Sequence, residues 1–163
     1  MLASEGAKFA LPEVKRGVAA IAGALPRLTR QVGRVRAMEM ALTGRDVSAE
    51  EAREWGLVNA VVKEQTPLVP TLTPPASPTE TATYTSVVQE AVRWAETICQ
   101  SSPDSVVASK EGVDLGWEGV GVDEATQRLI DGTWKNLEGG ENLKEGVRAF
   151  VEKRRPKWRD SKL

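Results

Sequence analysis

Apolar side chains recur every three or four residues between positions 25 and 42, which is the spacing of an amphipathic helix. Gly33 interrupts the pattern, so we expect two short helices that meet there, and Gly44 is expected to end the second one. The positions that this spacing assigns to the core are Leu28, Val32, Val35, Met38 and Leu42.

The segments on either side favour other local structures. Residues 8–18 contain Pro12 and lack helical spacing, so we expect a loop with some strand there. Ser48 and Glu51 have the spacing of a capping box, which predicts a helix over about 49–55, followed by a strand within LVNAVV.

Helical spacing dominates the rest of the chain, and we expect helices over about 86–99, 103–115, 123–137 and 142–151, the last one capped by Asn142. The side chains expected in the core are Cys99 in the first of these helices, Leu129, Ile130, Trp134 and Leu137 in the third, and Leu143, Val147, Phe150 and Val151 in the fourth.

Residues 64–83 differ in kind, because prolines set among threonines and serines support neither a helix nor a sheet ladder. We expect this segment to be an exposed, disordered insertion. The chain is therefore predicted to consist of an α/β part (1–63), the insertion (64–83), a helical oligomerisation region (84–160) and a terminal tripeptide (161–163).

Composition narrows the possible chemistry. The 22 basic and 23 acidic residues give a net charge of -1, so we expect no general attraction to nucleic acid. The sequence holds no histidine, which excludes histidine-based triads and histidine-bound zinc and leaves carboxylates as the acid/base groups; no metal site is expected. Cys99 is the only cysteine, so no intrachain disulfide can form. No apolar run approaches the roughly 20 residues that span a bilayer.

Three stretches carry a family resemblance: FALPEVKRG, RLTRQVGRVRAMEMALTGRDVSAEEAREWGLVNAVV and EGVRAFVEKRRPKW. They resemble the enoyl-CoA hydratase/isomerase, or crotonase, superfamily, and the order of their motifs is more specific than any single motif. The resemblance implies an α/β fold, a partial crotonase-type spiral of ββα turns followed by a C-terminal helical, trimerisation-type region that packs on neighbouring subunits.

Members of this family normally carry an N-terminal half before the segment that matches here. That half supplies both backbone N–H groups of the oxyanion hole and one catalytic glutamate. The resemblance therefore implies the C-terminal portion of a crotonase, without the N-terminal half of the active site, and it leaves open whether this chain alone is active.

Glu13 stands at the x-P-E position where the family places a glutamate beside the reacting carbons of the thioester. A carboxylate there can move a proton between water and substrate while an enolate-like charge forms on the thioester oxygen. Without the resemblance, a Pro-Glu pair is a common solvated turn. Residues 19–26 depart from the glycine-rich family pattern, and their larger apolar side chains are expected to reshape the acyl pocket.

Phe150 and Lys153 match family positions that contact the adenine and phosphates of coenzyme A, often across a subunit boundary. The alternative is structural, with Phe150 in an apolar stripe and Lys153 in a basic, solvated helix end.

Ser161, Lys162 and Leu163 end the sequence as S-K-L, the tripeptide that the peroxisomal import receptor reads, so we expect a peroxisomal location.

These features predict a peroxisomal enoyl-CoA hydratase-like protein of fatty acyl-CoA metabolism, with coenzyme A present only as part of the substrate. The expected partners are an acyl-CoA thioester, the import receptor, and either further copies in a trimer or hexamer or a full-length relative. Two alternatives stay open: an enoyl-CoA isomerase, which can work with one positioned carboxylate, and a non-catalytic oligomerisation partner or fragment of a crotonase.

Overall fold

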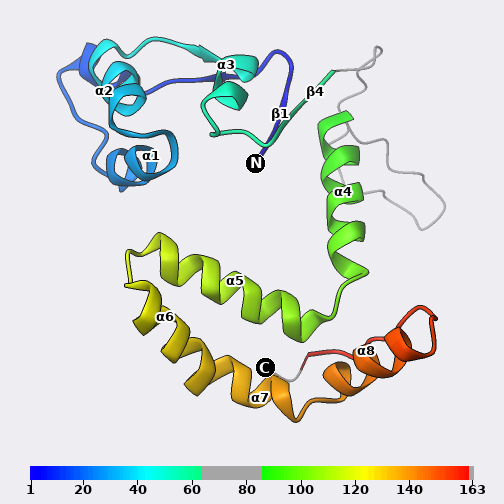
Figure 1. The fold of residues 1–163 in the computed structure, drawn as a ribbon. Helices are drawn as coiled ribbons and strands as arrows, with labels where there is room; N and C mark the ends of the chain where they lie inside the picture. The colour runs from blue at the N-terminus through cyan, green and yellow to red at the C-terminus, as the bar shows by residue number, and fades with distance from the viewer. Residues whose placement is uncertain (64–85, 162–163) are drawn as a thin grey trace, which may run out of the picture. The chain divides into compact units, whose positions relative to one another are not determined.

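The computed structural model describes residues 1–63 and 86–161 of the chain (Figure 1). The chain forms two compact units, Met1–Arg93 and Trp94–Leu163. The predicted insertion 64–83 lies outside the described residues, as do Lys162 and Leu163 of the terminal tripeptide.

Short strand pairs bring distant parts of the first unit together. Strand β1 (Leu2–Ser4) pairs in parallel with β4 (Ala60–Val62), which is the strand predicted within LVNAVV. Strand β2 (Lys8–Phe9) pairs antiparallel with β3 (Val47–Ser48). Because parallel strands require a long crossover connection, the segment between β1 and β4 holds the helices of this unit.

The crossover contains the 3-10 helix η1 (Pro12–Arg16), α1 (Ala24–Val32), α2 (Arg34–Thr43) and α3 (Ala49–Glu54). The predicted break at Gly33 is confirmed.

Two predicted helix boundaries are also confirmed. Gly44 ends α2 in a left-handed conformation with φ 58. Ser48 caps α3, because its side-chain oxygen accepts a hydrogen bond of 3.2 Å from the Glu51 N–H.

The prediction of a loop over residues 8–18 is wrong for Pro12–Arg16, which forms η1. Pro12 stands in the first helical turn, where its fixed φ suits a helix and its missing N–H loses no hydrogen bond. Gly17 ends the segment in a left-handed conformation with φ 74.

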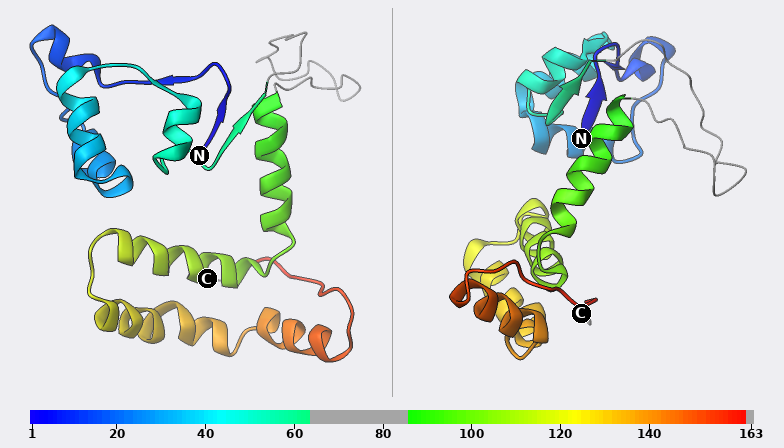
Figure 2. Two further views of the ribbon diagram at one scale, coloured as in Figure 1. Left: turned by 45° about the horizontal axis from the view of Figure 1, so that its top comes forward. Right: turned by 90° about the vertical axis from the view of Figure 1, so that its right-hand side faces the viewer.

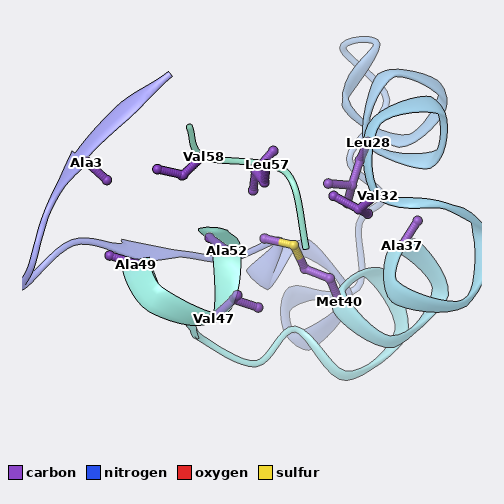
Figure 3. Close-up of a cluster of buried hydrophobic side chains, with 10 residues drawn as sticks. All are labelled: Ala3, Leu28, Val32, Ala37, Met40, Val47, Ala49, Ala52, Leu57 and Val58. Atoms are coloured by element: carbon purple, nitrogen blue, oxygen red, sulfur yellow. The ribbon is translucent and has the colours of Figure 1, made fainter. Parts of the chain in front are cut away.

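The core of the first unit lies between α1, α2, α3 and the segments that connect them (Figure 3). Leu28 and Val32 are buried as predicted, whereas Val35, Met38 and Leu42 are exposed. Gly33 has an extended ψ of 163, so α2 does not continue the helical turn of α1. The three-to-four-residue spacing of apolar positions in α1 therefore does not predict which side of α2 is buried. The buried side chains are Ala3, Leu28, Val32, Ala37, Met40, Val47, Ala49, Ala52, Leu57 and Val58.

Helix α4 (Ser86–Cys99) runs from the first unit into the second, and none of its residues is fully buried. Cys99 is exposed, so the prediction that it belongs to the core is wrong. Helical spacing alone gives α4 an apolar face, but within the described residues no element covers that face completely.

The second unit consists of helices that follow one another closely. Helix α5 (Pro103–Trp117) begins as predicted, with Ser102 accepting a hydrogen bond from the Ser105 N–H. It runs beside α6 (Val122–Leu129) (Figure 2). The Leu129 side chain of α6 lies against Gly112 of α5. A π-helical turn η2 (Ile130–Trp134), α7 (Lys135–Glu138) and α8 (Glu141–Val151) complete the unit.

The apolar stripes predicted for the last helices are partly wrong. Leu137 is buried, but Ile130 and Trp134 are exposed, because η2 interrupts the regular helix at Gly132. In α8, Phe150 is exposed, and so are Val147 and Val151.

Asn142 does not cap α8; it lies in the first turn and is buried. Its side-chain amide donates to Asp104 at 2.8 Å and to the Arg159 carbonyl at 3.0 Å. This polar contact ties the C-terminal segment to the start of α5. The indole N–H of Trp158 also donates a hydrogen bond of 2.8 Å to the Gln100 carbonyl.

Among the helices of residues 1–63 and 86–161, none combines the length and the hydrophobicity needed to cross a bilayer.

Candidate active site

Glu13 lies in the first turn of η1, directly after Pro12. Its backbone carbonyl accepts a hydrogen bond of 3.2 Å from the Val18 N–H. This bond holds the residue after Gly17 against the start of η1. The backbone that carries the carboxylate is therefore fixed on both sides, by the proline ring before it and by the left-handed glycine turn after it.

Gly44 brings the end of α2 into contact with η1. A Cβ atom at this position would lie 3.2 Å from the Leu11 carbonyl oxygen, from the Lys15 side chain and from the Val14 side chain. Both this close approach and the positive φ require glycine. The fit of η1 against α2, and with it the position of Glu13, depends on this residue.

The Glu13 side chain faces a cavity of about 160 Å³ between η1, α1 and α2. Its inner part is formed by buried or half-buried side chains, Leu11, Ala20, Leu25 and Ala41. Its rim is formed by the exposed side chains Val14, Val18, Ala19 and Leu42. Glu13 contributes the only polar side chain to this lining.

One carboxylate oxygen of Glu13, Oε2, is shielded from solvent and has no hydrogen-bond donor within the described part of the chain. Leaving a buried polar atom without a partner costs free energy, and such atoms in native proteins usually have a reason. A carboxylate that lines an apolar cavity and has an oxygen without a partner can accept a proton or a hydrogen bond from a bound molecule. The arrangement suits acid/base chemistry on a small ligand.

Arg45, which the sequence patterns did not single out, supports the corner next to Gly44. Its guanidinium donates to Glu39 at 2.8 Å and to both carboxylate oxygens of Glu51, and it lies 5.4 Å from the centre of the Trp55 ring. These hydrogen bonds, that of Glu51 first, raise the pKa of Arg45, and Arg45 in turn lowers the pKa of Glu51.

Phe150 and Lys153 lie together at the end of α8 in the second unit, where the Lys153 N–H donates to the Phe150 carbonyl at 3.3 Å. The Phe150 side chain is 85% exposed, so it is not a core residue of this chain. Lys153 adopts a left-handed conformation with φ 52. The structure thus brings these two candidates together, whereas Glu13 belongs to the other unit.

Next to them, basic side chains of α8 and of the segment after it line a cavity of about 390 Å³. Glu145 lies in it and accepts hydrogen bonds from the Arg154 guanidinium at 2.6 and 3.0 Å and from the Lys157 N–H at 2.7 Å. Arg154 first, and then Lys157, lower the pKa of Glu145 to about 2. The basic side chains that line this cavity are Lys144, Arg148, Arg154, Lys157 and Arg159.

Over the described ranges, 1–63 and 86–161, no group of three or more cysteine or carboxylate side chains is arranged to hold a metal ion.

Comparison with known proteins places this geometry in a family. Residues 1–71 match the family model described as enoyl-CoA hydratase/isomerase. A mevalonyl-coenzyme A hydratase of Beauveria bassiana is 51% identical over all 163 residues, and one of Aspergillus fumigatus is 46% identical over the same length. These alignments cover 51% and 53% of the two relatives, so the chain spans about half the length of the curated relatives it matches.

The fold has solved counterparts. A crystal structure of enoyl-CoA hydratase from Mycobacterium tuberculosis superimposes with a TM-score of 0.78 at 31% identity, covering 98% of this chain and 55% of that one. The predicted fold class, an α/β part of crotonase type followed by a helical region, is confirmed. The family match, the relatives aligned along the whole chain and the shared fold show together that this chain belongs to the enoyl-CoA hydratase/isomerase, or crotonase, superfamily.

Proposed function

We propose that this chain supplies the acid/base carboxylate of an acyl-CoA hydratase and that Glu13 is that carboxylate. The supporting observation is that the Glu13 side chain lines an apolar cavity and that its shielded Oε2 atom has no hydrogen-bond partner among the described residues. In the forward reaction, the OH of one water is added to C3 of a 2-enoyl thioester and a hydrogen to C2. Glu13 moves a proton between water and the substrate as the bonds change.

We further propose a mevalonyl-CoA type of substrate. Both fungal relatives named mevalonyl-coenzyme A hydratase align with every residue of this chain, at 51% and 46% identity. The Mycobacterium tuberculosis enoyl-CoA hydratase, named without a particular acyl group, is 31% identical. Hydration of fatty enoyl-CoA thioesters is the competing proposal.

Phe150 and Lys153 are proposed to bind the nucleotide part of coenzyme A. An aromatic ring that is 85% exposed is costly to leave in water and offers a stacking surface for adenine. A lysine three positions further can pair with phosphate.

Oligomer formation is also a proposal. Exposed Val147, Phe150 and Val151 form an apolar stripe on α8, and α4 exposes Val92 and Ile98. Such surfaces on a small unit favour association with another copy or with a full-length relative. A chain that assembles but neither binds nor converts a thioester would support the non-catalytic alternative.

The peroxisomal location is proposed from Ser161-Lys162-Leu163. A fluorescent fusion that keeps these residues at its C-terminus should colocalise with a peroxisomal marker, and the same fusion without them should not. A fusion that shows no dependence on the tripeptide would contradict this location.

The function is tested with purified protein and three thioesters: crotonyl-CoA, mevalonyl-CoA and a 3-enoyl-CoA. We expect water addition to crotonyl-CoA and reversible dehydration of mevalonyl-CoA, both followed by the absorbance of the conjugated thioester. Glu13→Gln should lower kcat by about 10²–10⁴-fold, whereas Glu54→Gln, an exposed change on α3, should leave it unaltered. Conversion of the 3-enoyl-CoA alone would favour the isomerase. Equal rates for wild type and Glu13→Gln would exclude Glu13 as the acid/base residue.

A further inference from the structure

We infer that the cavity beside Glu13 accepts only a short acyl group, of about six carbons, and that Leu25 sets this limit. The inference rests on the proposed function in one respect: it takes the occupant of the cavity to be the acyl part of a thioester.

The size of the cavity supports a short acyl group. A cavity of about 150 Å³ lined by apolar side chains holds a ligand the size of benzene, with six carbons. The cavity beside Glu13 measures about 160 Å³. An acyl chain of ten carbons exceeds this volume, and methylenes that stay in water gain nothing from burial.

The lining identifies the limiting wall. Among its inner side chains, Ala20 and Ala41 are small, so Leu11 and Leu25 are the two larger ones that take up space at the inner wall. Leu11 also packs on the main core of the unit, whereas Leu25 does not belong to that cluster. Shortening Leu25 therefore enlarges the cavity at less cost to the fold than shortening Leu11.

The chemistry of the lining adds a second restriction. Every side chain of this lining except Glu13 is apolar, and the shielded Oε2 atom of Glu13 has no hydrogen-bond partner in the described part of the chain. An acyl group that fits has an apolar body and one proton donor, such as a hydroxyl, near Glu13.

The test is binding rather than turnover. Affinities of coenzyme A and of butanoyl-, hexanoyl-, octanoyl- and decanoyl-CoA are measured by calorimetry with the full chain. A buried methylene tightens binding by roughly fourfold, so affinity should rise up to about six carbons and then level off. A rise that continues at this rate to ten carbons would overturn the inference, as would thioesters that bind no better than coenzyme A.

With Leu25→Ala, affinity should go on rising over about two or three further carbons before it levels off, because the change removes three carbon atoms from the wall of the cavity. Val35→Ala is the control, because Val35 is 79% exposed on α2 and does not line the cavity. Ala41→Leu should act in the opposite direction and shorten the accepted chain. Melting temperatures identify variants that do not fold. If Leu25→Ala and Ala41→Leu both fold and affinity still levels off at the same chain length as in wild type, Leu25 does not set the limit.

The outcome separates this inference from the proposed function. If affinity levels off near six carbons but no thioester is converted, the short cavity is supported and the hydratase is rejected. Turnover that falls in Glu13→Gln but is equal for all chain lengths would support the hydratase and reject the limit.

Discussion

Arg45 holds Glu51 through both terminal guanidinium nitrogens, and one of the two hydrogen bonds measures 2.9 Å. This pair joins the residue after α2 to the first turn of α3, and the third guanidinium nitrogen reaches back to Glu39 at 2.8 Å. Gly44, which fits against η1, directly precedes Arg45. The ion pair therefore stabilises the corner on which the position of Glu13 depends.

Arg45→Lys should lower the melting temperature by a few degrees, because a lysine cannot make a two-pronged contact with Glu51 and also bind Glu39. The loss should shrink at high salt, which screens the pair. Arg53→Lys is the matched control, since Arg53 makes a single-pronged contact with the exposed carboxylate of Glu50 at 3.0 Å. Thermal unfolding followed by circular dichroism measures both variants; equal melting temperatures for wild type and Arg45→Lys would contradict the stabilising role.

Gly44→Ala should destabilise the chain by about 2 kcal/mol, because alanine is strained at φ 58 and its Cβ would meet three atoms at 3.2 Å. It should also reduce any activity that depends on Glu13, since η1 must move away. Gly56→Ala has the same type of strain, with φ 81, but nothing within 4 Å of the new Cβ. It should cost about 1 kcal/mol and leave activity intact.

The pair of glycine variants is compared by urea unfolding and by the thioester assay. If Gly56→Ala lowers activity as much as Gly44→Ala does, the effect is general destabilisation and the contact with η1 does not position Glu13.

Lys153→Gly should raise stability by about 1 kcal/mol, because glycine adopts the left-handed conformation with φ 52 without strain. The same change removes the charge proposed to bind coenzyme A, so affinity for coenzyme A should fall. Lys153→Arg keeps both charge and strain and should change neither quantity. Urea unfolding and calorimetric titration with coenzyme A give the two readouts. Unchanged affinity in Lys153→Gly would remove Lys153 from the nucleotide site.

The stability of the second unit should depend on acid through Glu145. The pKa of its carboxyl is about 2 in the folded chain and 4.5 in its ordinary state. A carboxyl with a lowered pKa stabilises the folded state fully above the ordinary value, and this contribution is lost as pH falls toward 2. Wild type should therefore exceed Glu145→Gln in melting temperature at pH 6, and the two should converge near pH 2.

Glu138→Gln, an exposed change at the end of α7, serves as the control and should show no such pH-dependent difference. A gap between wild type and Glu145→Gln that is the same at pH 6 and pH 2 would contradict the role of the Arg154 pair.

Helix boundaries could be predicted from the sequence because their causes are local. The glycines at positions 33 and 44, and the caps at Ser48 and Ser102, act within a few residues of themselves. The buried face of α2 could not be predicted, since the turn at Gly33 sets its phase. Asn142 has the pattern of a cap, but its partner Asp104 lies 38 residues away in the sequence.

In the candidate site, too, features with a local cause could be predicted and features that depend on distant residues could not. The resemblance pointed to Glu13, and the structure adds the cavity and the shielded oxygen that the motif alone does not contain. Arg45 has no local signal, because its role depends on Glu39, Glu51 and Trp55 meeting around it.

The segment Ile130–Trp134 separates α6 from α7 and kinks at Gly132, where φ -101 and ψ -107 are not helical. At about 100° per residue, an unbroken α-helix would set Ala125 and Leu137 about 120° apart around its axis. The kink at Gly132 removes this constraint, because α7 does not continue along the axis of α6. Both side chains are buried, at 9% and 5% exposure. A chain of this type that continued α6 straight into α7 would present these two side chains on different faces of one helix and could bury both only with cover on two sides.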